Sequence, residues 1–355
     1  MASTTSSSRK DYRSRALGII GIAVIAAIAS YFYFRTDAAS EKRIALVLAA
    51  LRTPDEALPS IDRALESNPD DPELLSAKAR MMLLNGSAAL ELEPVSERWC
   101  KAQPGDAAPF RFRMFVMHSL NRKEEEIQNA ERVIALAPND QKTRTALASL
   151  YLSVSRFEEA SHQFRTLRNS TQSPLAEHLV GQARAETGRK DLVGAARLLE
   201  DLLAREPSHS EALVWRGIVH FEAGEYGQAA VKFRRARPQS SEERIFLLNH
   251  LGQALARDGK DEEAKQTFSE LTRVQNAMLL AIEAQHKRDD VGYQIRAGKA
   301  LLEAGQPADA VEVLEGALKR FGPRRDALLI LADCYHQLGQ AELATSTRTR
   351  ASQLP

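Results

Sequence analysis

Residues 217–236 read GIVHFEAGEYGQAAVKFRRA, and this stretch decides the fold. Small residues stand at Gly217 and Ala229, and a large aromatic residue follows at Phe233. The small residues would let two antiparallel helices approach closely, and Phe233 would fill the space beside them. Gly224 suits a tight turn between these helices, because glycine adopts a positive φ at little cost. The stretch therefore predicts a helical hairpin.

The same landmarks return along the chain with a period near 34 residues. The spacings of 7, 5, 4 and 3 residues between landmarks are kept in the next two copies and fade in the last. Prolines before the quoted stretch keep the same period, and each follows an apolar helical segment that it would end. These landmarks are Gly252, Gly259, Ala264, Phe268, Leu271, Gly298, Gly305, Ala310, Leu314, Ala317, Ala332, Gly339 and Ala344, and the prolines are Pro69, Pro104, Pro138 and Pro207.

This arrangement resembles the tetratricopeptide-repeat (TPR) family, whose first helix carries Leu-Gly-x-x-Tyr and whose second carries Ala-x-x-x-Phe. Here Leu251-Gly252 is followed by Ala264 and Phe268, and Leu147-Ala148 with Tyr151 is followed by Ala160 and Phe164. About nine copies cover residues 38–355. The resemblance implies an all-α, right-handed superhelical solenoid of about nine helix-turn-helix repeats over residues 35–355. Residues 277–290 interrupt the period and predict a break or an extra helix.

Residues 16–34 read ALGIIGIAVIAAIASYFYF and carry no charge. As a helix these nineteen residues would extend about 28 Å, close to the thickness of a bilayer's hydrocarbon core. They predict one transmembrane signal anchor, which the length of the apolar run favours over the alternative of a cleaved signal peptide. Basic residues in the tail 1–15 predict a cytoplasmic N-terminus and a solenoid outside the cytoplasm. The lack of a disulfide framework suits a bacterial periplasm.

The charge balance argues against nucleic acid as a partner. Residues 1–35 carry five basic groups and one acidic group, so the remainder, with 43 basic and 46 acidic residues, is weakly acidic. The two cysteines, Cys100 and Cys334, cannot form a four-ligand metal site by themselves. No zinc-protease or nucleophile-elbow motif occurs, and the glycines at 292 and 298 have the wrong spacing for a phosphate-binding loop. We therefore expect no catalytic site, metal or cofactor.

The resemblance also implies where a partner would bind. In the family, positions 5 and 9 of each first helix commonly point into a concave groove, and residues four apart share one helical face. The groove residues predicted in this way, with one neighbouring aromatic, are Arg80, Arg111, Phe115, Thr145, Ser149, His178, Gln182, Val214, Ile218, Phe221, Asn249, Gln253 and Lys299. This mixture of basic, polar and apolar residues favours a peptide or protein partner.

The leading hypothesis is thus a membrane-anchored protein-interaction scaffold, with a role in envelope assembly or secretion. One alternative is a structural tether that self-associates, to which the small residues Ala23 and Ala27 of the apolar segment could contribute as a homo-oligomer contact. Another is an enzyme whose site carries no recognisable motif.

Overall fold

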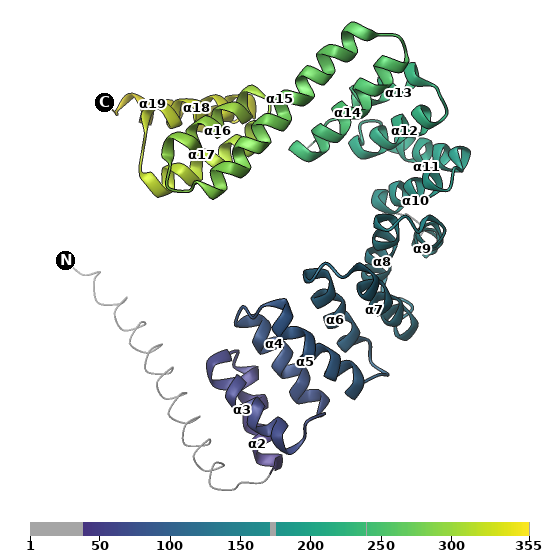
Figure 1. Ribbon diagram of the computed structural model, residues 1–355, viewed down its shortest axis with the longest axis vertical. Coiled ribbons are helices and arrows are strands. Elements are labelled where there is room, and N and C mark those ends of the chain that lie inside the picture. Colours follow the sequence, from purple (N-terminus) through teal and green to yellow (C-terminus); the bar gives the residue numbers. More distant parts are fainter. Residues whose placement is uncertain (1–37, 171–174, 239, 355) are drawn as a thin grey trace, which may run out of the picture. The chain divides into compact units, whose positions relative to one another are not determined.

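The computed structural model describes residues 38–170, 175–238 and 240–354, which form eighteen α-helices and no strand (Figure 1). The predicted tail 1–15 and membrane helix 16–34 lie outside the described residues. None of the helices in the described part is both long and apolar enough to span a bilayer. The helices are α2 (Ala38–Ala50), α3 (Pro54–Ser67), α4 (Pro72–Leu84), α5 (Ala89–Ala102), α6 (Ala107–Ser119), α7 (Lys123–Leu136), α8 (Gln141–Ser153), α9 (Phe157–Asn169), α10 (Ala176–Gly188), α11 (Leu192–Arg205), α12 (Ser210–Glu222), α13 (Tyr226–Arg235), α14 (Ser241–Arg257), α15 (Asp261–His286), α16 (Val291–Glu303), α17 (Pro307–Phe321), α18 (Arg325–Gln337) and α19 (Ala341–Ser352).

The helices alternate between a first helix (even-numbered) and a second helix (odd-numbered) of a repeat. Each turn from a first helix to its second helix contains one residue with positive φ. Successive residues of this kind are 34 or 35 positions apart in the sequence, except for Gly259 and Gly305, which are 46 apart. The predicted all-α solenoid of about nine helix-turn-helix repeats is therefore confirmed. The positive-φ residues are Arg52, Gly86, Asn121, Ser155, Lys190, Gly224, Gly259, Gly305 and Gly339.

The loops between repeats combine a helix stop with a helix start. Pro69, Pro104 and Pro138 follow second helices, and an aspartate stands two positions after each. The Asp71 carboxylate accepts hydrogen bonds from the backbone N–H groups of Glu73 and Leu74, at 3.0 and 3.2 Å. The aspartates at 106 and 140 cap α6 and α8 in the same way. This Pro-x-Asp spacing ends one repeat and begins the next.

The two helices of a repeat interlock through a small residue on the first and a large residue on the second. A Cβ atom at Gly217 would lie 2.5 Å from the ring of Phe233, whose side chain is fully buried. Gly298 and Leu314 meet in the same way, also at 2.5 Å. The structure therefore confirms the predicted close approach of the two helices at these glycines.

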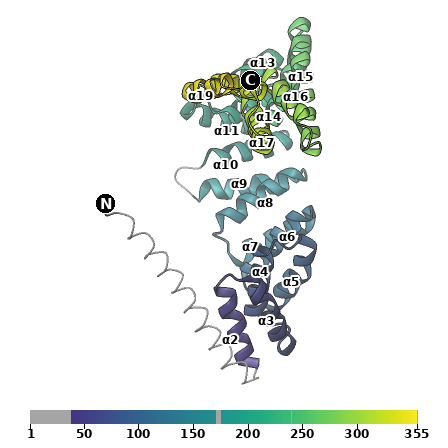
Figure 2. The ribbon, with the colours of Figure 1, turned by 90° about the vertical axis from the view of Figure 1, so that its left-hand side faces the viewer.

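The described residues divide into two compact units, one ending at Arg156 and containing α2–α8, the other beginning at Phe157 and containing α9–α19. Within the first unit, α2, α3, α4 and α5 stack side by side, as two perpendicular views show (Figures 1 and 2). Their buried core includes Ile61, Leu74 and Leu75. Because each hairpin buries its apolar face only against its neighbours, stability accumulates along the stack.

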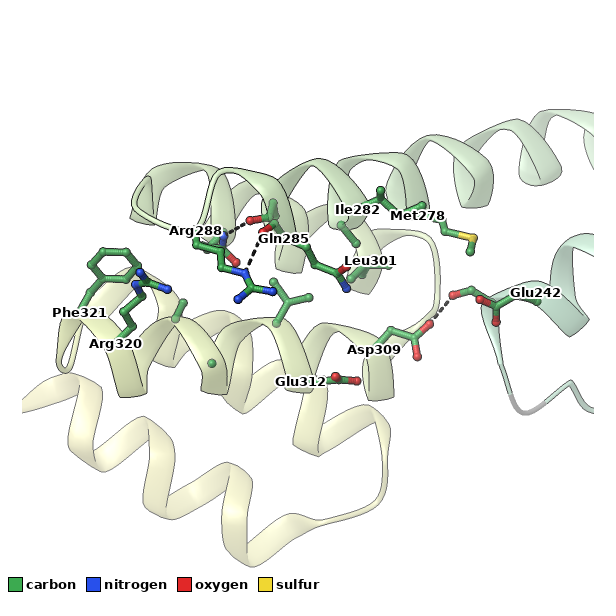
Figure 3. A pocket seen from close by; sticks show the side chains of 17 residues that line it. Glu242, Met278, Ile282, Gln285, Arg288, Leu301, Asp309, Glu312, Arg320 and Phe321 are labelled. Atoms are coloured by element: carbon green, nitrogen blue, oxygen red, sulfur yellow. Dashed lines mark hydrogen bonds between the residues drawn. The ribbon is translucent and has the colours of Figure 1, made fainter. Parts of the chain in front are cut away.

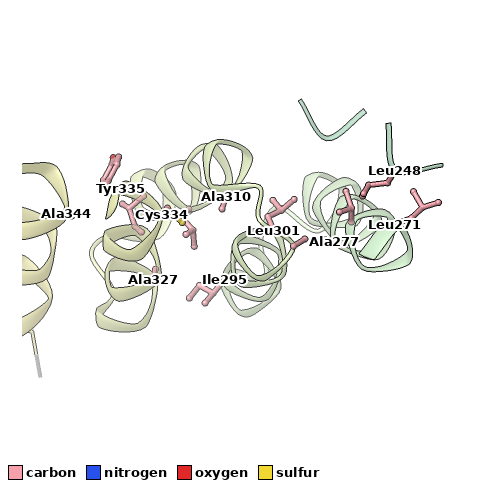
Figure 4. Packing of buried hydrophobic residues seen from close by; sticks show 14 residues of the cluster. Leu248, Leu271, Ala277, Ile295, Leu301, Ala310, Ala327, Cys334, Tyr335 and Ala344 are labelled. Atoms are coloured by element: carbon pink, nitrogen blue, oxygen red, sulfur yellow. The ribbon is translucent and has the colours of Figure 1, made fainter. Parts of the chain in front are cut away.

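The second unit contains one helix of unusual length. α15 spans 26 residues, and its first half packs on α14 while its second half packs on α16. Figure 4 shows this division, with Leu248 and Leu271 together at one end and Ala277 beside Leu301. The segment 277–290 thus continues α15 to His286 and then turns, and it forms no separate helix. The interval of 46 residues between the turns at Gly259 and Gly305 is long because the second helix α15, which lies between them, is long.

Candidate functional site

The first helices form the inner side of each stack. In the second unit α10 contacts α12, α12 contacts α14, and α16 contacts α18, whereas second helices of the described repeats make no comparable contacts with one another. α2 and α4 are in contact in the first unit. Elements that approach one another more closely lie on the inside of a curved array. The face formed by the first helices is therefore the candidate site in each unit.

In the first unit, Arg80 lies in a hollow that spans three successive first helices. The hollow measures about 400 Å³ and is lined by Leu46 of α2, by Ser76 and Arg80 of α4 and by Ala108 of α6. Arg80 is exposed and makes no ion pair with another described residue. Its guanidinium is therefore available to a carboxylate of a partner.

Arg111 has a structural partner. Its guanidinium lies 2.8 Å from the carboxylate of Asp140, the residue that caps α8. Burial alone would raise the pKa of Asp140, but hydrogen bonds from Thr143 and Arg111 outweigh it and lower this pKa. Arg111 thus braces two successive first helices of the unit.

The other predicted residues of the first unit differ in exposure. Phe115 is 44% exposed and tilts against Phe112 with ring centroids 6.4 Å apart. The Thr145 hydroxyl donates to its own helix, at the Gln141 carbonyl oxygen. Ser149 is exposed and lines a separate hollow of about 360 Å³. Phe115 is thus the most accessible apolar anchor among the predicted residues of this unit.

In the second unit, His178 and Gln182 do not lie on the surface as expected. Both are 4% exposed, because α10 is packed by α9, α11 and α12 and is buried along nearly its whole length. The Gln182 amide donates to Glu186, a buried carboxylate on the same helix. The prediction that these two side chains line a groove is therefore corrected to a role in the interior of the repeat.

Glu186 is the centre of a buried polar network. It accepts hydrogen bonds from the Ser161 hydroxyl at 2.7 Å and from Arg189. Burial alone would raise the pKa of Glu186, but the bonds from Ser161, Arg189 and Gln182 together lower it. A buried carboxylate with this many donors is satisfied in its charged form. The network therefore joins α9 to α10.

A row of aromatic and cationic side chains crosses the first helices α10, α12 and α14. The Arg184 guanidinium lies over the Trp215 ring, 5.0 Å from its centroid. Trp215 and Phe246 have centroids 6.5 Å apart, and Phe246 lies 4.2 Å from His250. Phe246 is 40% exposed. We call these four residues the aromatic row.

The aromatic row was not among the residues predicted from sequence. Positions 5 and 9 of the first helices include Val214 and Asn249 and pass over Trp215 and Phe246. The available signal was a large aromatic residue on each of two successive first helices, since aromatic side chains dominate binding surfaces.

The remaining predicted residues lie around the aromatic row or beyond it. Val214 and Phe221 are partly buried, and Ile218 is only 7% exposed, so its expected place in the groove is corrected to the core. The Gln253 amide donates to Asn249 at 3.1 Å. Lys299 is exposed and lies 3.7 Å from Glu303 on the same helix.

The groups gathered on this face recognise ligands by stacking, charge and hydrogen bonding. Within the described ranges, no three histidine, cysteine, aspartate or glutamate side chains lie together as a metal-binding group. Cys100 and Cys334 are buried thiols, and burial raises the pKa of each to about 11. The exposed aromatic and charged side chains of this face are suited to binding.

Comparison with known proteins agrees with this fold. The sequence profile of the tetratricopeptide repeat matches residues 42–107, 181–243 and 295–345, together just over half of the chain. No curated protein matches the sequence.

Solved structures similar to the fold include three with low sequence identity. A tetratricopeptide repeat protein from Parabacteroides merdae has 11% identity and a TM-score of 0.44, over 89% of this chain and 98% of that one. YrrB, described as a TPR protein with an unusual peptide-binding site, has 18% identity and a TM-score of 0.44, over 53% and 96%. Naa15/Naa10 bound to HypK-THB has 12% identity and a TM-score of 0.43, over 90% of this chain but only 64% of that one. With its repeats matched over half of its length, the chain belongs to the tetratricopeptide-repeat family.

Proposed function

We propose that this chain is a membrane-tethered scaffold that binds a segment of a partner protein along its first-helix face. The aromatic row carries the proposal, because it combines a partly exposed Phe246 on α14 with an Arg184 on α10 that stacks on Trp215 of α12. Side chains of these types supply most of the binding energy at protein interfaces. The proposal assigns binding to the chain, and no catalytic step.

The partner segment would need both apolar and acidic groups. In the second unit an apolar side chain would pack on Phe246 and Trp215. In the first unit Phe115 offers a second apolar contact, and the unpaired Arg80 offers a site for a carboxylate. Each unit is thus suited to a short stretch of a partner protein.

The membrane tether rests on the sequence. Residues 16–34 are apolar and uncharged, and basic residues precede them, which supports a single anchor with the repeats outside the cytoplasm. A bacterial periplasm would suit this topology. A scaffold there would serve the assembly or secretion of envelope components.

Crosslinking and pull-down of the full chain from membranes tests the binding function. Arg184→Glu and Phe246→Ala should each reduce recovery of a stoichiometric partner at least about tenfold, as expected for contacts at the centre of an interface. Val193→Ala is the matched control, because Val193 is an apolar residue of the second helix α11 that is 80% exposed. Thermal melts of all variants establish that they remain folded.

Three results would contradict parts of the proposal. Recovery of only the chain itself would favour the self-associating tether. A partner retained equally by all three variants would place its binding site away from the aromatic row, which carries the proposal. A form without residues 1–35 that remains with the membrane fraction would contradict the tether.

A further inference from the structure

A hollow lies beside the long helix α15. It measures about 520 Å³ and lies between the second half of α15 and α17, with Leu301 of α16 as its floor (Figure 3). Ser241 and Glu242, at the start of α14, close one end. α14 and α16 make no contact comparable to that of α10 with α12 or of α16 with α18, and the lengthened α15 leaves this space unfilled.

The walls of the hollow are helical faces with an apolar middle. α15 contributes Met278, Ala281 and Ile282, whose spacing places them on one face. α17 contributes Val313, Gly316 and Ala317, which also share a face. Ile282 is 43% exposed. Small and apolar residues therefore line the middle of the hollow, where another helix could approach closely.

Gly316 is not explained by packing within the chain. A glycine inside a helix lowers its stability by roughly 0.5–1 kcal/mol relative to alanine. At Gly217, Gly252 and Gly298 a side chain of the following helix occupies the place of the missing Cβ atom. At Gly316 a Cβ atom would meet nothing within 4 Å. The space kept open at Gly316 faces the hollow.

The two ends of the hollow carry opposite charge (Figure 3). Glu242, Asp309 and Glu312 lie at one end, where Asp309 accepts a hydrogen bond from Ser241. Arg288 and Arg320 lie at the other end. Arg320 pairs with Asp289 at 2.7 Å, but both side chains are at least half exposed, so this pair exchanges readily for another carboxylate.

We propose that this hollow is a docking site for one amphipathic α-helix of a partner protein. The docked helix carries a lysine or arginine near Glu312, an apolar face over Gly316 and an acidic residue near Arg320. Glu312 and Arg320 are eight residues apart on α17, a separation of about 12 Å or roughly two turns. The inference rests on the proposed function as a protein-binding scaffold and adds a site on the side of the second helices.

A helix fits this site better than an extended peptide. The backbone groups of α15 and α17 are already bonded within their helices. An extended segment would bring its own N–H and C=O groups against Ala281, Val313 and Ala317, which offer no hydrogen bond in return. A helix satisfies its backbone internally and presents only side chains to the hollow.

Binding of designed helical peptides to the full chain tests the site. The probe is a fluorescein-labelled peptide of about four turns with a leucine-rich face, one lysine near one end and one glutamate near the other. Two control peptides keep the apolar face and carry lysine at both ends or glutamate at both ends. Since a helix can dock in either direction, only the mixed pair matches both ends of the hollow, and it should bind about three- to tenfold more tightly than either control.

Substitution at Gly316 locates the peptide. Gly316→Trp should weaken binding of the mixed-charge probe at least about tenfold by filling the hollow. Gly316→Ala should leave its affinity within about twofold. Ala308→Trp is the matched control, because Ala308 is exposed on α17 and does not line the hollow. Fluorescence anisotropy gives each affinity, and thermal melts establish that each variant is folded.

Three outcomes would overturn the inference: no binding of any probe up to about 1 mM, equal binding by wild type and Gly316→Trp, or equal affinity for all three peptides. Sedimentation of the full chain tests whether a second copy of the chain occupies the hollow. Self-association that Gly316→Trp abolishes would also overturn the inference. Arg184→Glu and Phe246→Ala do not touch the hollow. Their failure to affect partner recovery would count against the aromatic row and not against the hollow.

Discussion

The regular repeats at α10–α14 and the region at α15–α17, which contains the long helix α15, belong to one unit, but their helices pack differently. In the regular repeats, successive first helices touch, and the α12–α13 hairpin is closed by Gly217 under the large side chain of Phe233. Beyond α15, the α16–α17 hairpin keeps this closure at Gly298 and Leu314. The first helix α16, however, makes no comparable contact with the preceding first helix α14. The difference shows that closure within a hairpin and contact between neighbouring repeats can be separated.

This separation has a functional consequence. Where repeats touch, the side chains left for a partner lie on the first-helix face, as the aromatic row does. Where a lengthened second helix moves the repeats apart, a hollow opens on the other side and Gly316 is left without a neighbour. One unit can therefore offer two surfaces of different chemistry.

The largest expected effect comes from removing the side chain that closes a regular hairpin. Phe233→Ala should cost about 3–5 kcal/mol, because the buried ring leaves a cavity. Hydrogen exchange should accelerate most in α12 and α13 and least in α17–α19, since repeats are stabilised by their neighbours. Uniform acceleration across both regions would show that the long α15 transmits stability as well as a regular contact does.

A smaller loss is expected when the closure is overfilled. Gly217→Ala places a methyl group 2.5 Å from the Phe233 ring, and such overpacking costs about 1–3 kcal/mol. Urea unfolding measures this loss. An unchanged midpoint would mean that Phe233 moves aside without cost.

Acid should weaken the regular repeats. Burial lowers the pKa of His178 and, against the opposing effect of Glu225, that of His220, so the fold favours neutral imidazoles. Their contribution to stability is complete above the ordinary value of 6.5 and is lost as pH falls below it. The thermal midpoint should therefore fall between about pH 7 and about pH 5. The double variant His178→Gln and His220→Gln should lose this part of the fall, and an identical fall would assign it to other groups.

The smallest effect has the opposite sign. Gly316→Ala should stabilise the chain by about 0.5–1 kcal/mol, because alanine favours the helix and its methyl group meets no atom. Urea unfolding beside Gly217→Ala makes the contrast direct. Destabilisation by Gly316→Ala would mean that the hollow is filled by the chain itself.

Much of the fold follows from local sequence signals. The turn glycines Gly224, Gly259, Gly305 and Gly339 lie where expected, with positive φ. The equivalent turns at Asn121 and Lys190 have the same backbone conformation without glycine, so the glycine pattern alone could not place them. The repeat period nevertheless passes through them, because stacking constrains the length of every repeat.

The site was less predictable, because exposure depends on neighbouring repeats. One rule of position selected both Arg80, which is exposed, and His178, which is buried by the helices around α10. The hollow beside α15 could be predicted only if residues 277–286 were known to extend a helix. The interrupted repeat period is equally consistent with a break in the solenoid. These properties arise from packing between segments that are far apart in the sequence.

Photocrosslinking in intact cells tests the central claim, that a partner protein binds the first-helix face. The full chain would carry benzoylphenylalanine in place of Phe246 or, as the control, in place of Val193 of α11, which is more exposed than Phe246. We expect a discrete adduct with a different protein from position 246 and none from position 193. Equal adducts from both positions, or adducts of the chain only with itself, would contradict the account.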